Sequence, residues 1–364
     1  RVREAMVDAL DRVAADQLIN FSDFDNENGG MGDGWIDAIT FVHSGYAAEF
    51  GGTAGGADMK DRIWSHRWVI NTWTDATSGV RVRDYNINPG IWGTSDFKIG
   101  HIGVICHELG HFFGLPDLYD YSGAGEGIGS WGLMTNSWGF DGSQLHPPHM
   151  CAWSKVTLGW TSATVISDPK EYSIDAATEV NANIYRINFA GVPNEYLLIE
   201  NRQPKGNFDG GIPSGSDGAA GGLAIWHIDD SKTENDTPGY PGQTGWPANG
   251  NHYWVGLLQA DGRFDLEKGV NRGDGDDVYR KGHVDNIGPT TTPFSNSYTG
   301  EQGPLITNIS ASGDTMTFQL GGGTPPPLVS NPVFAKQVQV EVPTSNAANF
   351  SDDGKAATLL FDRL

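Results

Sequence analysis

The sequence is poor in the residues that define several classes of protein. It has only two cysteines in 364 residues, which excludes a scaffold held together by many disulfides. No run of about eighteen apolar residues occurs, so we expect no membrane-spanning helix. Lysine and arginine number 23 against 45 aspartates and glutamates, and the formal net charge is −22. A field of this sign repels nucleic acid and anionic membrane surfaces, so neither is an expected partner.

The strongest chemical pattern lies between Cys106 and Asp117, where the apolar periodicity predicts a helix. In a helix, His107 and His111 lie four residues apart on one face, which is the spacing of two imidazoles that bind one zinc ion. Glu108 flanks the same face, where it can act as the general base toward a water molecule. These three residues are therefore the candidate catalytic and metal-binding groups.

The residues after this helix extend the pattern. Gly114 and Pro116 end the helix, because glycine accepts the left-handed position and proline cannot continue the helical hydrogen bonds. The sharp turn lets Asp117 return to the metal as a third ligand and leaves a fourth position for water. The complete pattern HExxHxxGxxD is more specific than HExxH, and it favours a zinc site over two surface histidines on an ordinary helix.

Two acidic, glycine-rich loops are candidate calcium sites, because closely spaced side-chain oxygens are what calcium binds. The loop at 21–37 differs from an EF-hand, since it has no glutamate at the twelfth position and no helix follows. The loop at 261–277 has less regular spacing. The alternative for both is a solvated acidic turn. The candidate ligands are Asp23, Asp25, Asn28, Asp33 and Asp37 in the first loop, and Asp265, Asn271, Asp274 and Asp276 in the second.

Several motifs together resemble the immune inhibitor A family of metallopeptidases, which are secreted zinc proteases of the metzincin type. They are the HExxHxxGxxD segment, the Trp131–Met134 turn and the segments 147–160, 195–202, 222–229 and 258–265. The resemblance implies that His107, His111 and Asp117 bind zinc and that Glu108 is the general base. It also implies that Met134 forms the turn beneath the zinc ion.

The resemblance and the pattern of strands together predict an α+β protein. We expect a metzincin-like zinc protease domain at 1–160, with a mixed sheet and the active-site helix, whose N-terminal part is missing. Short alternating segments predict a β-sandwich-like accessory domain at 161–320. A Gly/Pro linker at 321–332 and the start of a truncated β domain at 333–364 are expected to follow.

The two cysteines have two interpretations. Cys106 faces away from the histidines of the predicted helix, so it cannot bind the same metal. It is either a small buried hydrophobic residue or the partner of Cys151, which begins the following helix. In an oxidising compartment two lone cysteines favour pairing, and we therefore predict a disulfide between the two helices.

The sequence thus predicts a secreted, monomeric zinc endopeptidase that acts on proteins or peptides and also binds structural calcium. Two alternatives belong to other functional classes. One is a zinc hydrolase of non-peptide amides or esters, because the motif determines how water is activated and not which bond is attacked. The other is a calcium-stabilised extracellular binding module with a vestigial zinc site, which the intact ligand set and general base disfavour.

Overall fold

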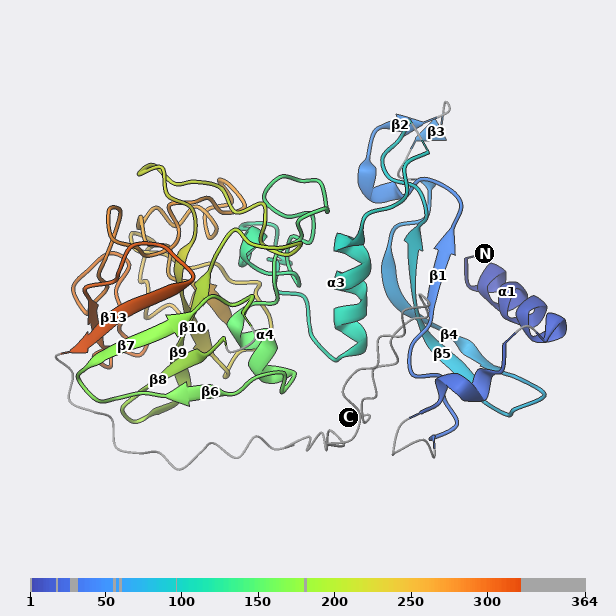
Figure 1. Ribbon diagram of the computed structural model, residues 1–364, viewed down its shortest axis with the longest axis horizontal. Coiled ribbons are helices and arrows are strands. Elements are labelled where there is room, and N and C mark those ends of the chain that lie inside the picture. The colour runs from blue at the N-terminus through green and yellow to red at the C-terminus, as the bar shows by residue number, and fades with distance from the viewer. Residues whose placement is uncertain are drawn as a thin grey trace. The chain divides into compact units, whose positions relative to one another are not determined.

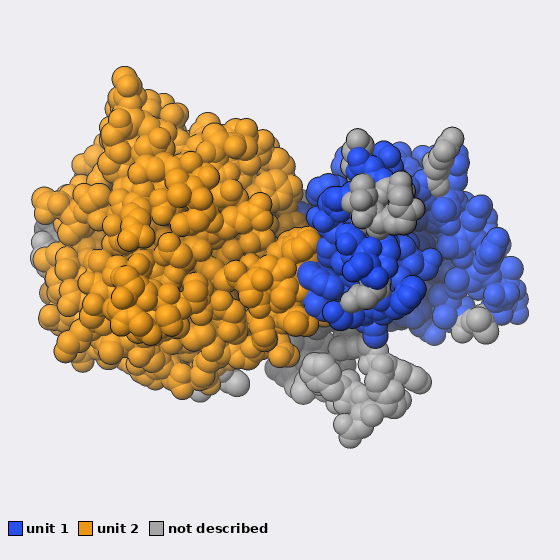
Figure 2. Space-filling model, turned by 90° about the horizontal axis from the view of Figure 1, so that it is seen from above, with its two compact units in different colours: residues 1–101, 108–114, 333–364 blue, residues 102–107, 115–332 orange. Residues whose placement is uncertain are grey.

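The computed structural model describes residues 2–17, 19–26, 32–54, 57–58, 61–95, 97–179 and 182–321 (Figure 1). Within these ranges the chain forms two compact units, coloured separately in Figure 2. Unit 1 contains residues up to 101 and residues 108–114, and unit 2 contains residues 102–107 and 115–321. The calcium candidate Asn28, the predicted linker beyond residue 321 and the predicted C-terminal β domain lie outside the described residues.

Unit 1 is a helix packed with a small sheet. The sheet has the order β1-β5-β4, in which β1 is parallel and β4 is antiparallel to β5. Its core contains Met6 and Leu10 of the helix together with Ile70 and Tyr85 of the sheet, so the apolar face of the helix is the buried one. The elements are α1 (Val2–Asp16), η1 (Phe21–Phe24), β1 (Thr40–His43), η2 (Ala48–Phe50), β2 (Thr53–Ala54), β3 (Ala57–Asp58), β4 (His66–Thr74) and β5 (Arg81–Pro89).

Unit 2 is built on a five-stranded sheet of order β11-β10-β9-β8-β6 and a three-stranded sheet of order β12-β13-β7. Helix α3 (Ile102–Phe112) is divided between the two units. The other elements are η4 (Gly129–Trp131), α4 (Ala152–Thr157), β6 (Ala163–Val165), β7 (Glu171–Asp175), β8 (Ile184–Phe189), β9 (Val192–Arg202), β10 (Gly222–Asp229), β11 (Val255–Leu257), β12 (Leu305–Thr307) and β13 (Thr315–Gly321).

The central strands of unit 2 are covered on both faces. Alternate residues of β9 and β10, such as Leu197 and Ile225, share a core with Phe318 of β13. The residues between them, such as Leu198 and Trp226, belong to a second core. Every residue of β10 is therefore buried, as in strands with no face toward solvent. The architecture is a mixture of few helices and several sheets, and among the described residues no helix is long and apolar enough to cross a membrane.

Residues 115–160, which follow α3, pack on the sheets of unit 2. The second core of unit 2 contains Leu118, Trp131 and Met134 together with the strand residues Leu198 and Trp226. These side chains come from the segment after α3, and their burial against β9 and β10 places residues 115–160 in unit 2. Sequence alternation marked where the strands begin, but it could not show that the preceding loops are packed on them.

A buried ionic network joins β9 to this segment. Arg202 is fully buried, and its Nε donates to Asp209 Oδ2 at 2.7 Å while its Nη1 donates to the Trp131 carbonyl at 2.7 Å. Glu200 lies 3.2 Å from Arg202 Nη1 and 2.8 Å from Lys155 Nζ. Two cations face two carboxylates, so no net charge is left in the core. Burial alone would raise the pKa of Glu200, but the charges of Lys155 and Arg202 outweigh burial and lower it.

His149 lies beside this network and is held neutral. Its backbone N–H donates to Asp209 Oδ1 at 2.8 Å. Burial, together with the positive charge of Lys155, lowers the pKa of its imidazole to about 4. Below the ordinary pKa of 6.5 the unfolded chain therefore binds a proton that the folded protein does not bind until about pH 4. Acidification through this window destabilises the folded state.

We expect the free energy of unfolding to fall by about 2 kcal/mol between pH 6.5 and about pH 5 because of His149, at about 1.4 kcal/mol per pH unit. The comparison is urea unfolding of the wild type and of His149→Asn across this range. The free energy of unfolding of the variant should fall less over the same pH range, because the variant lacks the buried imidazole. Protonation of the other titratable groups is common to both proteins and cancels in the difference. Identical pH slopes would contradict the assignment.

Candidate metal centre

Helix α3 carries the two predicted histidine ligands, and its first turn is held by the loop after it. The backbone N–H of Val104 donates to Gln144 Oε1 at 3.0 Å, which satisfies one of the free donors at the helix start. Gly103 lies so close to the same loop that a Cβ atom there would be 2.2 Å from the Ser137 carbonyl oxygen. Only glycine fits at this position, and the close packing fixes where the helix begins.

The end of α3 follows the predicted turn. The backbone N–H of Gly114 donates to the His111 carbonyl at 3.1 Å, and Gly114 has φ +87°, a left-handed conformation that favours glycine. Leu115 and Pro116 then lead the chain away from the helix axis. This turn returns Asp117 to the helix face that bears the histidines.

The structure brings His107, His111 and Asp117 together. One donor atom from each lies within 4.8 Å of the others, and His107 is buried while the other two are half-buried. His107 Nε2 lies 3.0 Å from Asp117 Oδ1. Glu108, the predicted general base, is also buried and adjoins the first ligand on the same helix. The set of two imidazoles and one carboxylate is a donor combination that zinc accepts in catalytic sites.

The orientation of His107 is compatible with a metal ion at this site. Its Nδ1 lies 2.9 Å from the Leu133 carbonyl oxygen, which can only accept, so Nδ1 carries the proton. In a neutral imidazole Nε2 is then a bare lone pair, and it faces a carboxylate oxygen of Asp117. Two lone-pair atoms at this distance repel each other unless a metal ion or a proton lies between them. The residues present therefore fit a zinc ion.

Tyr121 was not predicted, although it contacts the third ligand. Its hydroxyl donates to Asp117 Oδ2 at 2.7 Å, so the two oxygens of this carboxylate have different partners. Burial and the hydrogen bond to Asp117 raise the pKa of Tyr121 to about 12, which keeps the hydroxyl a donor. Such contacts orient metal ligands. The available sequence signal was a tyrosine four residues after Asp117, within reach across one turn.

The turn containing Met134 lies next to the segment that carries Asp117. Leu118 N–H donates to the Met134 carbonyl at 2.8 Å, and the Leu133 carbonyl is the acceptor for His107. The Met134 side chain is buried in the core shared with β9 and β10. Two consecutive residues of this turn thus contact the metal-binding segment through their backbone carbonyls, which sequence patterns do not reveal.

The predicted disulfide is not formed, and both cysteines are free thiols. Cys151 precedes α4, and its Sγ lies 3.3 Å from Ser154 Oγ. Cys106 packs against the same core as a partly buried residue. Burial raises the pKa of both thiols, which keeps them protonated and unreactive. The interpretation of Cys106 as a small buried hydrophobic residue therefore describes it better.

The first predicted calcium loop is organised by backbone hydrogen bonds. Asp25 accepts from the N–H groups of Asp33 at 2.8 Å and Gly34 at 3.0 Å. Asp37 accepts from the Asn26 N–H at 3.3 Å, and Asp23 accepts from the Asn20 amide at 3.0 Å. Among the described residues of this loop, no three acidic side chains bring their oxygens within 4.8 Å of one another.

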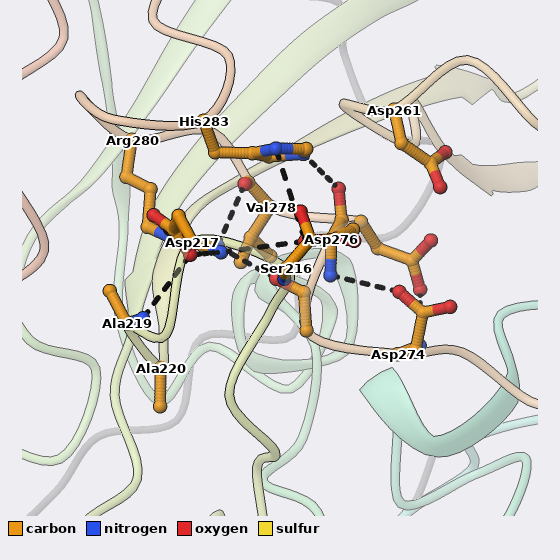
Figure 3. Close-up of polar contacts among 12 residues, drawn as sticks. Ser216, Asp217, Ala219, Ala220, Asp261, Asp274, Asp276, Val278, Arg280 and His283 are labelled. Atoms are coloured by element: carbon orange, nitrogen blue, oxygen red, sulfur yellow. Dashed lines mark hydrogen bonds and ion pairs between the residues drawn. The ribbon is translucent and has the colours of Figure 1, made fainter.

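The second acidic loop contains a different group from the predicted one. Asn271 donates from its amide to Asp265 at 3.2 Å and to Asp274 at 3.3 Å, so these three predicted residues are neighbours. Asp276 instead accepts from Ser216 at 2.7 Å and lies 3.6 Å from Arg280, as Figure 3 shows. Three carboxylates meet in this region, because one oxygen from each lies within 4.8 Å of the others. They belong to Asp261, Asp274 and Asp277.

Comparison with known proteins confirms the predicted resemblance. Residues 1–161 match the family described as immune inhibitor A peptidase M6, catalytic domain. Pre-pro-metalloprotease PrtV of Vibrio cholerae serotype O1 (strain ATCC 39315 / El Tor Inaba N16961) is 34% identical over 172 residues, which are 43% of this chain and 18% of that protein. Immune inhibitor A of Bacillus thuringiensis subsp. alesti is 30% identical over 209 residues, which are 51% of this chain and 27% of that protein. The chain thus covers less than a third of either relative. Residues 1–161, which match the family, include the metal centre.

Replacement of Tyr121 tests its role as a positioning residue. Tyr121→Phe removes the hydrogen bond to Asp117, so the carboxylate gains freedom and zinc affinity should fall by about 10- to 100-fold. The measurement is the zinc Kd from competition with a chromogenic chelator. Tyr185→Phe is the matched control, because it removes a hydroxyl that donates to the Ser173 carbonyl in the β-rich part of unit 2. Equal zinc affinity of both variants would refute the role.

Proposed function

We propose that this protein is a zinc-dependent endopeptidase that hydrolyses peptide bonds in proteins. The observation that carries the proposal is the convergence of His107, His111 and Asp117 with Glu108 next to the first ligand. The match of residues 1–161 to a metallopeptidase catalytic domain supports it independently. The name of the Vibrio relative, a metalloprotease, agrees with the same chemistry.

In this proposal His107, His111 and Asp117 hold the metal. Zinc, when bound by these groups, acts as a Lewis acid that polarises a carbonyl and makes water a better nucleophile. The Leu133 carbonyl fixes the tautomer of His107 so that Nε2 is the coordinating atom. Tyr121 holds the Asp117 carboxylate through the oxygen that does not face His107. An aspartate ligand adds more negative charge than a third histidine, which moderates the electrophilicity of the site.

Glu108 carries out the proton transfers. As the general base it takes a proton from the attacking water while the new C–O bond forms at the peptide carbonyl. It then delivers that proton to the amide nitrogen as the C–N bond breaks, so the leaving group departs as a neutral amine. The residue is buried, which limits its exchange of protons with bulk water. One carboxylate therefore serves as base in the first step and as acid in the second.

The remaining features of the proposal follow from the same resemblance. We assign a metzincin-like catalytic arrangement in which Met134 forms the turn beneath the metal, followed by a β-sandwich-like region. Support for the second part comes from the core that β13 and β7 share with β9 and β10. We also propose that the protein is secreted and monomeric, with protein or peptide substrates, in line with its resemblance to immune inhibitor A.

The decisive variant is Glu108→Gln. It keeps the size of the side chain but removes the group that accepts a proton, so casein hydrolysis should fall by at least about 100-fold. Zinc content, measured by atomic absorption, should stay at the wild-type level because Glu108 is not among the three grouped ligands.

Glu171→Gln is the matched control, because Glu171 is an exposed residue at the start of β7. It should retain full activity. Near-normal casein hydrolysis by Glu108→Gln would overturn the assignment of the general base. Hydrolysis of small esters or non-peptide amides, with no cleavage of casein or other proteins by the wild type, would overturn the substrate class.

A further inference from the structure

We propose that Asn235 and Tyr253 are positioning residues for the third metal ligand, Asp117. Both lie beyond residues 1–161, which match the catalytic domain of the family, and all three residues belong to unit 2. This positioning role rests on the proposed function, since it concerns the same metal centre. It is tested through metal binding and not through catalysis, so the two proposals can fail separately.

Asp117 lies in a segment that contains no helix or strand, so other contacts must determine its position. The next residue, Leu118, is fully buried and is held at both of its backbone groups. Its N–H donates to the Met134 carbonyl at 2.8 Å, and its carbonyl accepts from Asn235 Nδ2 at 2.9 Å. The Leu118 N–H belongs to the planar peptide group that links it to Asp117, so fixing Leu118 restricts the backbone that carries the ligand.

Asn235 uses its whole side-chain amide to connect this segment to β11. The residue is fully buried. Its Nδ2 donates to the carbonyls of Leu118 and Val255, both at 2.9 Å, and its Oδ1 accepts from the Val255 N–H at 3.0 Å. Val255 belongs to β11, which is the last strand at one edge of the five-stranded sheet. The amide therefore pairs with Val255 as a neighbouring strand would, and its remaining donor holds Leu118.

Tyr253 holds the same segment two residues further along. Its hydroxyl donates to Asp120 Oδ2 at 3.0 Å and accepts from the Gly127 N–H at 3.3 Å. The side chain is buried, and burial raises the pKa of the hydroxyl, which stays protonated and able to donate. Gly127 itself lies against Leu118, because a Cβ atom there would be 2.0 Å from the Leu118 carbonyl oxygen. The chain is thus fixed at Leu118 and again at Asp120.

These contacts matter because the Asp117 carboxylate must meet the imidazoles at one point. Its Oδ1 lies 3.0 Å from His107 Nε2. A carboxylate on an unanchored loop would sample many orientations, and that freedom would be lost when a metal ion binds. Anchoring the loop on the sheet removes this freedom beforehand, which strengthens binding of the ion without adding a ligand. Asn235 and Tyr253 supply this anchor from more than a hundred residues further along the chain.

Asn235→Ala tests the proposal, with Asn201→Ala as the matched control. Asn201 is also a fully buried asparagine of unit 2, and its Nδ2 donates to the carbonyls of Ile174, Gly313 and Asp314. None of these contacts involves the metal-binding segment. Both variants lose buried hydrogen bonds, one next to Asp117 and the other away from it. The Tm of each is measured, so that a general loss of stability is separated from metal positioning.

The zinc Kd is measured by competition with a chromogenic chelator, and the visible spectrum of the cobalt-substituted protein reports the ligand geometry. Asn235→Ala should weaken the zinc Kd by at least about tenfold and change the cobalt spectrum, as loss of outer-shell contacts typically does. Asn201→Ala should keep the wild-type Kd and spectrum even if its Tm falls by a similar amount. Tyr253→Phe keeps the ring and removes only the hydroxyl, and it should also weaken zinc binding, by about tenfold.

If Asn235→Ala does not fold, the comparison of Tyr253→Phe with Tyr185→Phe decides, since both remove one hydroxyl from unit 2. The proposal is overturned if the folded variants of Asn235 and Tyr253 keep the wild-type zinc Kd and cobalt spectrum. It is also overturned if Asn201→Ala alters both as much as Asn235→Ala. A zinc-loaded wild type that cleaves no protein would overturn the proposed function instead, and would leave the differences in zinc Kd unaffected.

Discussion

The buried ion pair between Arg202 and Asp209 is the interaction on which the rest of unit 2 depends. Arg202 joins strand β9 to the Trp131 carbonyl, and Asp209 accepts the backbone N–H of His149. Removal of one charge from such a pair leaves the other unpaired in a low-dielectric interior, which typically costs about 3–5 kcal/mol. Glu200 extends this pair by contacting both Arg202 and Lys155. The buried network is electrically neutral only when both carboxylates and both cations are present.

This network explains how an irregular segment can hold a functional side chain in a fixed orientation. The segment after α3 contains little regular structure, yet it makes hydrogen bonds in three directions, two through backbone carbonyls and one through a side chain. Trp131 contacts Arg202 through its carbonyl and Asp277 through its indole, while the Leu133 carbonyl orients His107. The sheet therefore determines the position of the loop, and the loop determines the orientation of the His107 imidazole. Loops with functional groups are commonly positioned by a rigid scaffold in this way.

The sequence predicted the local part of the site well, because helical geometry alone places His107 and His111 on one face. It could not predict contacts that depend on the tertiary fold. Tyr121 meets Asp117 only once the chain has turned. In the irregular acidic loop, adjacent carboxylates point in different directions, and spacing cannot show that Asp277 and not its neighbour joins the cluster. The packing of residues 115–160 on β9 and β10 was not predictable for the same reason, since apolar loop residues give no periodic signal.

The close contact of Gly103 with the loop that follows α3, at Ser137, also affects how the metal can be exchanged. Because no side chain fits between this residue and the Ser137 carbonyl, α3 cannot slide along its axis without breaking that packing. The protein contacts that orient His107 and Asp117 do not themselves include the metal. If zinc is bound as proposed, we expect these contacts to keep His107 and Asp117 near the site when a chelator removes the ion, so that the metal can be exchanged without unfolding of the chain.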